Sequence, residues 1–352
     1  MYPSSASSET GRDPWADGPR PAPAGPTRGY PPEPRTGPAA EETGERRQRG
    51  PRRARRGGEP PRRADDEPAE PAEEEAVEPV PVNRPLALTV AGFAALLGVG
   101  LVLGAQTAGP GHRLPFAGII LGVQLLYVLA WTMAMRPPAL LVVALVSTAA
   151  AVAADAAAVR SDIAALAPLG YVAAGGFLLG VLGQLVRRVD RARVTESLGA
   201  TLLIVVGVVA FATLVVLSRI PAGTQAITVC LTAAGVALTV ARLTDAVAPW
   251  PRLAPQVPRG AAGVVAGAMV GTLVSAVLGS YLVGFTPTSG ALIGVVTAAT
   301  AVLADLAVGY AEAGRLMAGE PPTMWVARHL QGPLGGFALA APAAYAMCTL
   351  FL

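Results

Sequence analysis

The chain lacks lysine, and beyond its first 84 residues it has few charges of either sign. Residues 85–352 carry 13 Arg and eight acidic residues, while residues 1–84 carry the other 14 Arg and 16 acidic residues. The two cysteines, Cys230 and Cys348, lie far apart in apolar runs, which excludes a disulfide framework and a cysteine zinc site. His112 and His329 have no partner at ligand spacing, and no nucleophile motif is present.

The first 84 residues are rich in Pro, Gly, Arg and Glu, and they cannot bury enough apolar surface to form a core. We therefore predict a disordered cytoplasmic tail over 1–84 and a membrane domain over 85–352. Arg46–Arg63 holds nine Arg and one Glu, whereas Asp65–Glu78 holds eight acidic residues and no base. The Arg block is a candidate contact for anionic lipid, and the alternative is a solvated low-complexity segment. No nucleic acid is expected as a partner, because no aromatic residues interleave the arginines.

What the rest of the chain has is long apolar runs. About 20 apolar helical residues cross a bilayer core of ~30 Å, and neither the length nor the pattern of these runs suits barrel strands. The sequence predicts an all-α, polytopic transmembrane helix bundle with nine spans, near 86–106, 116–135, 139–159, 164–186, 197–217, 222–245, 261–284, 289–309 and 333–352.

Arginine placement predicts the orientation of these spans. The loops after the even-numbered spans and the turns beside them carry ten Arg, and the other loops carry three, Arg113, Arg160 and Arg219. Because positive residues concentrate on the cytoplasmic side, we expect the N-terminus inside a cell membrane and the C-terminus outside.

The seventh span repeats a small residue at every fourth position, which places one stripe along a helix. These residues are Gly263, Gly267, Gly271, Ser275 and Gly279. Such a stripe lets a neighbouring helix approach closely. The pattern predicts either a tightly packed interior face or a homodimer contact.

Three carboxylates fall within spans, where each costs ~2.5–3.5 kcal/mol at a helix centre on insertion scales. We expect Asp155 to reach the interface or to pair with Arg160. Asp245 and Asp305 both fall near the cytoplasmic ends of their spans, so they converge if those helices are neighbours. Two carboxylates suit Mg²⁺ together with substrate phosphates. The alternative is that each acid pairs with a nearby Arg, such as Arg242 for Asp245.

Three segments together resemble the C-terminal half of phosphatidate cytidylyltransferases, the CDP-diacylglycerol synthases. They are TDAVAPWPRLAPQVPRGAAGVVAG (Thr244–Gly267), AVLADLAVGY (Ala301–Tyr310) and GPLGGFALAAPAAY (Gly332–Tyr345). The resemblance covers about residues 197–352. It implies a polytopic enzyme that joins CTP to phosphatidic acid, releases pyrophosphate, and binds divalent metal through acids at the cytoplasmic face.

The charged signature of that family is largely missing. Where the family has Ser-Pro-x-Lys-Thr, this chain reads PRGAA (Pro258–Ala262), and Leu334, Leu339 and Ala340 stand at the family's His, Asp and Arg. Asp305 clearly survives. Phosphoryl chemistry depends on positioning and on charge stabilisation by Lys, Arg and metal. Without the family's Lys, His and Arg groups, several kcal/mol of transition-state stabilisation is absent.

The sequence therefore favours an inactive relative of the synthases, serving as a scaffold or binding a lipid or nucleotide headgroup. The alternative is an active, divergent transferase in which Arg252, Arg259 and Arg315 hold phosphate in place of the missing cations. A transporter or envelope assembly component is the third reading; the acids near one face and the lack of an internal repeat argue against it.

Overall fold

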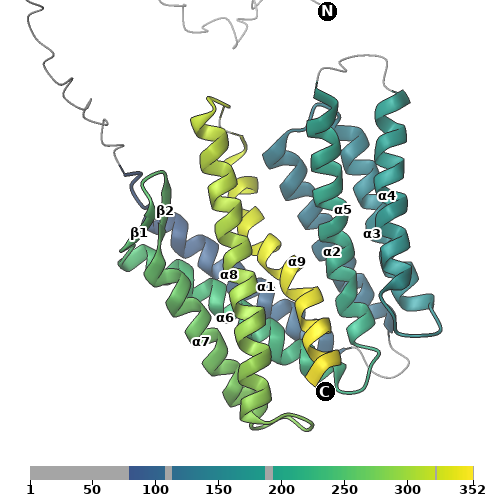
Figure 1. The fold of residues 1–352 in the computed structure, drawn as a ribbon, viewed down its shortest axis with the longest axis vertical. Coiled ribbons are helices and arrows are strands. Elements are labelled where there is room, and N and C mark those ends of the chain that lie inside the picture. Colours follow the sequence, from purple (N-terminus) through teal and green to yellow (C-terminus); the bar gives the residue numbers. More distant parts are fainter. Residues whose placement is uncertain (1–78, 108–112, 187–192, 322, 352) are drawn as a thin grey trace, which may run out of the picture. The chain divides into compact units, whose positions relative to one another are not determined.

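The computed structural model describes residues 79–107, 113–186, 193–321 and 323–351. In those ranges nine helices are long and apolar enough to cross a membrane, which confirms the predicted polytopic all-α bundle (Figure 1). The predicted disorder of the tail and its Arg46–Arg63 block fall outside the described residues. The helices are α1 (Arg84–Gln106), α2 (Arg113–Met135), α3 (Leu140–Arg160), α4 (Ala167–Val186), α5 (Val194–Leu217), α6 (Gly223–Val247), α7 (Ala261–Gly279), α8 (Pro287–Met317) and α9 (Trp325–Phe351).

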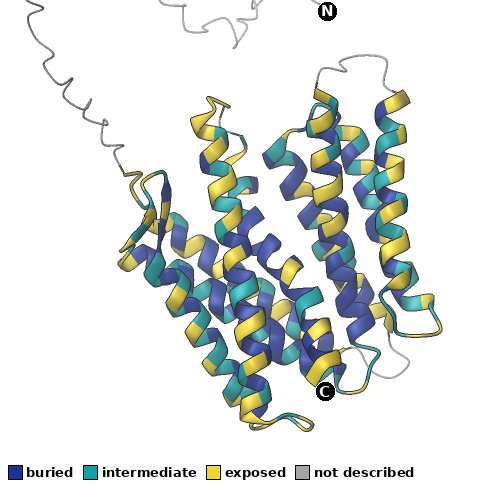
Figure 2. Cartoon of the chain, in the orientation of Figure 1, coloured by how far each residue is buried: buried dark blue, intermediate teal, exposed yellow. Residues whose placement is uncertain are grey.

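Two groups of helices make up the membrane domain. One contains α1, α6, α7 and α8, the other contains α2, α3, α4 and α5, and α9 packs against members of both. Figure 2 shows that buried residues concentrate where these helices meet and exposed residues on the outer faces. Many of the exposed residues are large and apolar, such as Leu141, Leu178 and Met269. In a bilayer those outer faces contact lipid, so their exposure has no solvation cost. Helix α5 is buried along most of its length, with Phe211 and Leu214 fully enclosed.

A short antiparallel hairpin, β1 (Arg252–Ala254) and β2 (Val257–Gly260), lies between α6 and α7, where the sequence predicted only a loop. We call the face of the domain that carries it, and on which α1 begins, the hairpin face. Val80, within the predicted tail, donates its N–H to the Pro255 carbonyl over 2.9 Å. Contacts with the membrane domain therefore start at least five residues before the predicted boundary at residue 85.

Two helices extend beyond their predicted spans at the hairpin face. Helix α8 continues to Met317, and α9 begins at Trp325, so the segment between the two spans is mostly helical. At 1.5 Å per residue, a 31-residue α8 is about 46 Å long. Because this exceeds the hydrocarbon thickness, α8 is long enough for its C-terminal turns, which carry Glu312 and Arg315, to extend beyond the core of a bilayer.

The small-residue stripe of α7 lies in the interior. Gly263, Gly267, Gly271, Ser275 and Gly279 are the buried residues of that helix. A side chain on Gly267 would come within 2.5 Å of the Ala237 carbonyl on α6, and one on Gly279 within 2.7 Å of the Thr286 carbonyl before α8. The stripe therefore lets α7 pack closely between α6 and α8.

The prediction that Asp155 reaches the interface or pairs with Arg160 is wrong. The residue is buried, and its Oδ1 accepts a 3.1 Å hydrogen bond from Gln124 Nε2 on α2. Five helical positions turn through about 500°, which puts Arg160 roughly 140° around the helix from Asp155. The two side chains therefore point in different directions.

Candidate functional site

Asp245 on α6 and Asp305 on α8 meet near the hairpin face through Arg259 on β2. Arg259 Nε lies 2.5 Å from Asp245 Oδ2, and Arg259 Nη1 lies 2.6 Å from Asp305 Oδ2. Arg242 on α6 also engages Asp305, with its Nε 3.1 Å from Oδ2 and its Nη2 against Oδ1. Two arginines and two aspartates thus form one charge-balanced cluster, which we call the buried ion cluster.

Local structure explains how Arg259 enters the interior. The β1–β2 hairpin folds back over the end of α6, and Gly260, at its last position, donates its N–H to Asp245 Oδ1 over 3.0 Å. A side chain at Gly260 would overlap the backbone of Pro249, so the hairpin can close here only with glycine. The closed hairpin directs the Arg259 side chain into the interior, where the residue is 2% exposed.

Charge balance makes this burial tolerable. An isolated buried ion is costly unless it is paired and hydrogen-bonded. Burial lowers the pKa of the Arg259 guanidinium, but Asp305 and Asp245 raise it by more, so its pKa is above the ordinary value. Arg259 therefore stays charged.

The predicted alternative in which Arg242 pairs with Asp245 is wrong in its partners. Arg242 reaches across to Asp305, and Arg259 takes Asp245. Arg242 and Asp245 are three positions apart on one helix, a spacing at which side chains can pair. The hairpin, which the sequence did not reveal, supplies a closer partner.

The arrangement does not fit a divalent cation as the sequence hypothesis placed it. Both Asp305 oxygens face guanidinium groups, and a metal between the aspartates would have to displace Arg259. In the described ranges no three His, Cys, Asp or Glu side chains are grouped so that they could hold a metal ion.

A pocket of about 290 Å³ opens beside the ion cluster. We call it the hairpin-face pocket; α1, β2, α8 and α9 line it, and its polar lining includes Arg242, Arg259, Glu312, Arg328 and His329. Arg328 Nε pairs with Glu312 Oε1 at 2.8 Å. Arg259 Nη2 is buried and has no hydrogen-bond partner. Several cationic groups thus line the pocket, and one of them, Arg259, has a buried donor atom, Nη2, without an acceptor.

The three arginines predicted to hold phosphate do not meet. Arg259 lines the hairpin-face pocket, whereas Arg252 bonds the Val80 carbonyl and Arg315 bonds the Ala134 carbonyl at the end of α2. Sequence reasoning missed Arg328 and His329 as pocket residues. Both lie in the first turns of α9, before the predicted ninth span near 333–352, so no sequence pattern connected them to the pocket.

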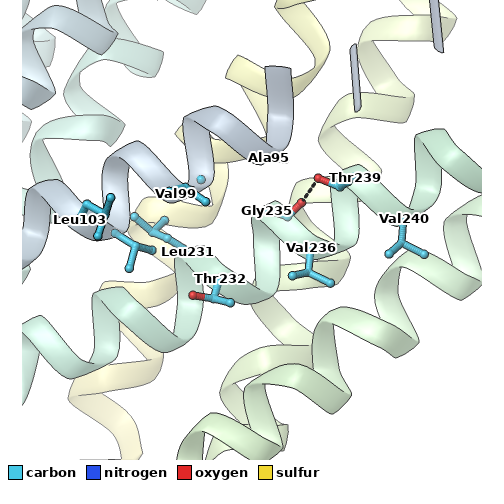
Figure 3. A pocket seen from close by; sticks show the side chains of 11 residues that line it. Ala95, Val99, Leu103, Leu231, Thr232, Gly235, Val236, Thr239 and Val240 are labelled. Carbon is cyan, nitrogen blue, oxygen red and sulfur yellow. Dashed lines mark hydrogen bonds between the residues drawn. The ribbon is translucent and has the colours of Figure 1, made fainter. Parts of the chain in front are cut away.

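An apolar cleft of about 410 Å³ lies elsewhere, between α1 and α6 (Figure 3). Gly98 and Gly235 let these helices approach closely, and the Thr239 hydroxyl is satisfied by the Gly235 carbonyl over 2.7 Å. No charged side chain lines it, so its chemistry suits only hydrocarbon.

No protein-family model matches the chain, and a search of curated proteins gives no match.

Proposed function

We propose that this membrane protein is a non-catalytic relative of the CDP-diacylglycerol synthases that binds an anionic phosphate headgroup in the hairpin-face pocket, on the cytoplasmic side of a cell membrane. The observation that carries the proposal is Arg259, which lies between Asp245 and Asp305, pairs with both, and together with Arg242 balances their charge. An aspartate pair that a protein cation already neutralises is poorly suited to hold catalytic metal.

Retained binding is supported by the unsatisfied donor. A buried N–H group without an acceptor costs about 1–3 kcal/mol. Arg259 lines the pocket, and a phosphate oxygen that displaced its cover and reached the buried Nη2 would remove that cost; charge-assisted bonds to guanidinium groups are among the strong ones. Arg242 and Arg328 are 18% and 16% exposed, so both remain accessible from the pocket.

The ion pairs of the arginines that line this pocket support the proposal that the protein is not catalytic. Transfer of a cytidylyl group develops negative charge on the leaving pyrophosphate, which needs cations beyond those that hold the ground state. Arg242 and Arg259 are committed to Asp305, and Arg328 to Glu312. The chain contains no lysine that could replace them.

Two measurements on the purified full-length protein test the two halves of the proposal. Radiolabelled CTP, phosphatidic acid and Mg²⁺ should give no labelled lipid with either the native chain or Asp305→Asn. Incorporation that disappears in Asp305→Asn would establish the divergent transferase instead.

Headgroup binding is measured separately, by thermal stabilisation in detergent with short-chain phosphatidate, with CTP, and with short-chain phosphatidylcholine as the neutral control. We expect the anionic probes to raise Tm, and Arg328→Gln to weaken that effect. Arg84→Gln, at the exposed start of α1, is the matched control. Equal shifts with phosphatidate and phosphatidylcholine, together with no shift by CTP, would refute headgroup recognition.

A further inference from the structure

A third cavity, of about 390 Å³, is lined by residues from α2, α5, α8 and α9. Trp131, Val206, Ala307 and Leu339 represent its four walls, and Arg315 is its one charged lining residue. We call it the Arg315 groove. It shares only Val308 with the hairpin-face pocket.

The groove opens sideways toward the bilayer. Three of its apolar lining residues, Leu203, Val206 and Leu339, are 43%, 44% and 46% exposed on the outer surface of the domain. A hydrocarbon chain can therefore enter from the membrane without crossing a polar barrier.

Arg315 lies at the hairpin-face end of this groove. Its Nη1 donates to the Ala134 carbonyl over 3.2 Å, in the last turn of α2. Contact with the end of a membrane-spanning helix places the guanidinium at headgroup level, where Arg attracts anionic lipid.

Arg315 differs from the arginines of the hairpin-face pocket in its charge balance. Arg242, Arg259 and Arg328 each pair with a carboxylate, whereas Arg315 forms no ion pair with any residue in the described ranges. Glu312, one turn earlier on α8, is taken by Arg328. Glu320 lines a small hollow beside Arg315 but forms no ion pair with it, so the groove ends at a cation that no acid in the described ranges holds in an ion pair.

We propose that the Arg315 groove binds one acyl chain of an anionic membrane lipid, with the lipid's headgroup at Arg315. A helix from a second copy does not fit, because a cylinder of ~10 Å diameter and this volume would be about 5 Å long, less than one helical turn. A nucleotide or hydrated ion does not fit apolar walls. An acyl chain fits the walls, and an anionic head fits the end.

Trp131 provides a local probe, because among the tryptophans in the described ranges it lines the groove and Trp250 and Trp325 do not. In a chain that keeps only Trp131, with Trp15, Trp250 and Trp325 changed to Phe, its fluorescence is measured in bilayers doped with lipid brominated on the acyl chain. We expect brominated phosphatidylglycerol to quench Trp131 with an apparent affinity about fivefold above that of brominated phosphatidylcholine, the scale of one Arg contact with anionic lipid.

Three variants assign that preference to the groove. Arg315→Gln should remove the preference for phosphatidylglycerol, and Ala307→Phe, at an exposed position of the groove wall, should reduce quenching by both lipids. Arg84→Gln should leave both unchanged. A chain that keeps only Trp325, 60% exposed and outside the groove, should show no preference.

Equal quenching by the two lipids, or a preference that persists in Arg315→Gln, would overturn the proposal. So would the absence of quenching by either lipid, since that would mean the groove excludes acyl chains. Each result is independent of CTP or phosphatidate binding in the hairpin-face pocket.

Discussion

Arg259 on β2 and Asp305 on α8 form a buried ion pair, with 2.6 Å between Nη1 and Oδ2, although 46 positions separate them in the chain. The pair connects the hairpin to a membrane-spanning helix, and Asp245 extends the connection to α6. Removing one member of a buried pair is far costlier than the pair's net contribution, because an unpaired charge is left behind.

Arg259→Gln should therefore destabilise the protein strongly. Asp245 would lose its cationic partner and keep only the Gly260 N–H, so we expect a loss of about 3–5 kcal/mol in free energy of unfolding. Thermal unfolding in detergent measures it, with the half-exposed hairpin residue Arg252→Gln as the control. A Tm equal to that of the native chain would contradict the role given to the ion cluster.

Gly332 on α9 should not tolerate a side chain. A methyl group there would overlap the Asp305 carboxylate and come within 2.9 Å of Arg242 Nη2, so Gly332→Ala should separate this ion pair and lower Tm. Gly314→Ala, in open space on α8, is the matched control and should be neutral or stabilising by about 0.5–1 kcal/mol. If Gly332→Ala behaved like Gly314→Ala, the close packing of α9 on Asp305 would be refuted.

A substitution on the interior face of α7 should lower the free energy of unfolding more than one on its outer face. Gly267→Val brings a side chain against the Ala237 carbonyl, which cannot move without distorting α6, and should cost about 1–3 kcal/mol or more. Met269→Val, at a position 67% exposed to lipid, should stay within about 0.5 kcal/mol. Denaturation in detergent compares the two, and an equal cost would mean that the stripe is not a packing surface.

The proposed orientation places the hairpin face in the cytoplasm. With Cys230 and Cys348 changed to Ala, single cysteines at Gln256 in the hairpin turn and at Ser280 after α7 report opposite faces. In intact cells an impermeant thiol reagent should label Ser280→Cys and not Gln256→Cys. Labelling of the hairpin position alone would reverse the orientation.

The number and type of the membrane helices were set by the sequence itself. Lipid offers no partner for backbone groups, so an apolar run of about 20 residues has essentially one structure open to it. The spacing of small residues on α7 is likewise local information, because a period of four residues defines one side of a helix whatever surrounds it. These features depend on residues close together in the chain.

The ion cluster was decided by tertiary structure. Whether Asp305 meets a metal, Arg242 or Arg259 depends on how α6 and α8 pack and on a hairpin of seven strand residues too short to show an alternating pattern. The same holds for Asp155, which the sequence predicted at the interface or paired with Arg160 and which packing places beside Gln124. A side chain in lipid must find its partner across helices, and single-sequence periodicity indicates which side of a helix it occupies but not which helix it meets.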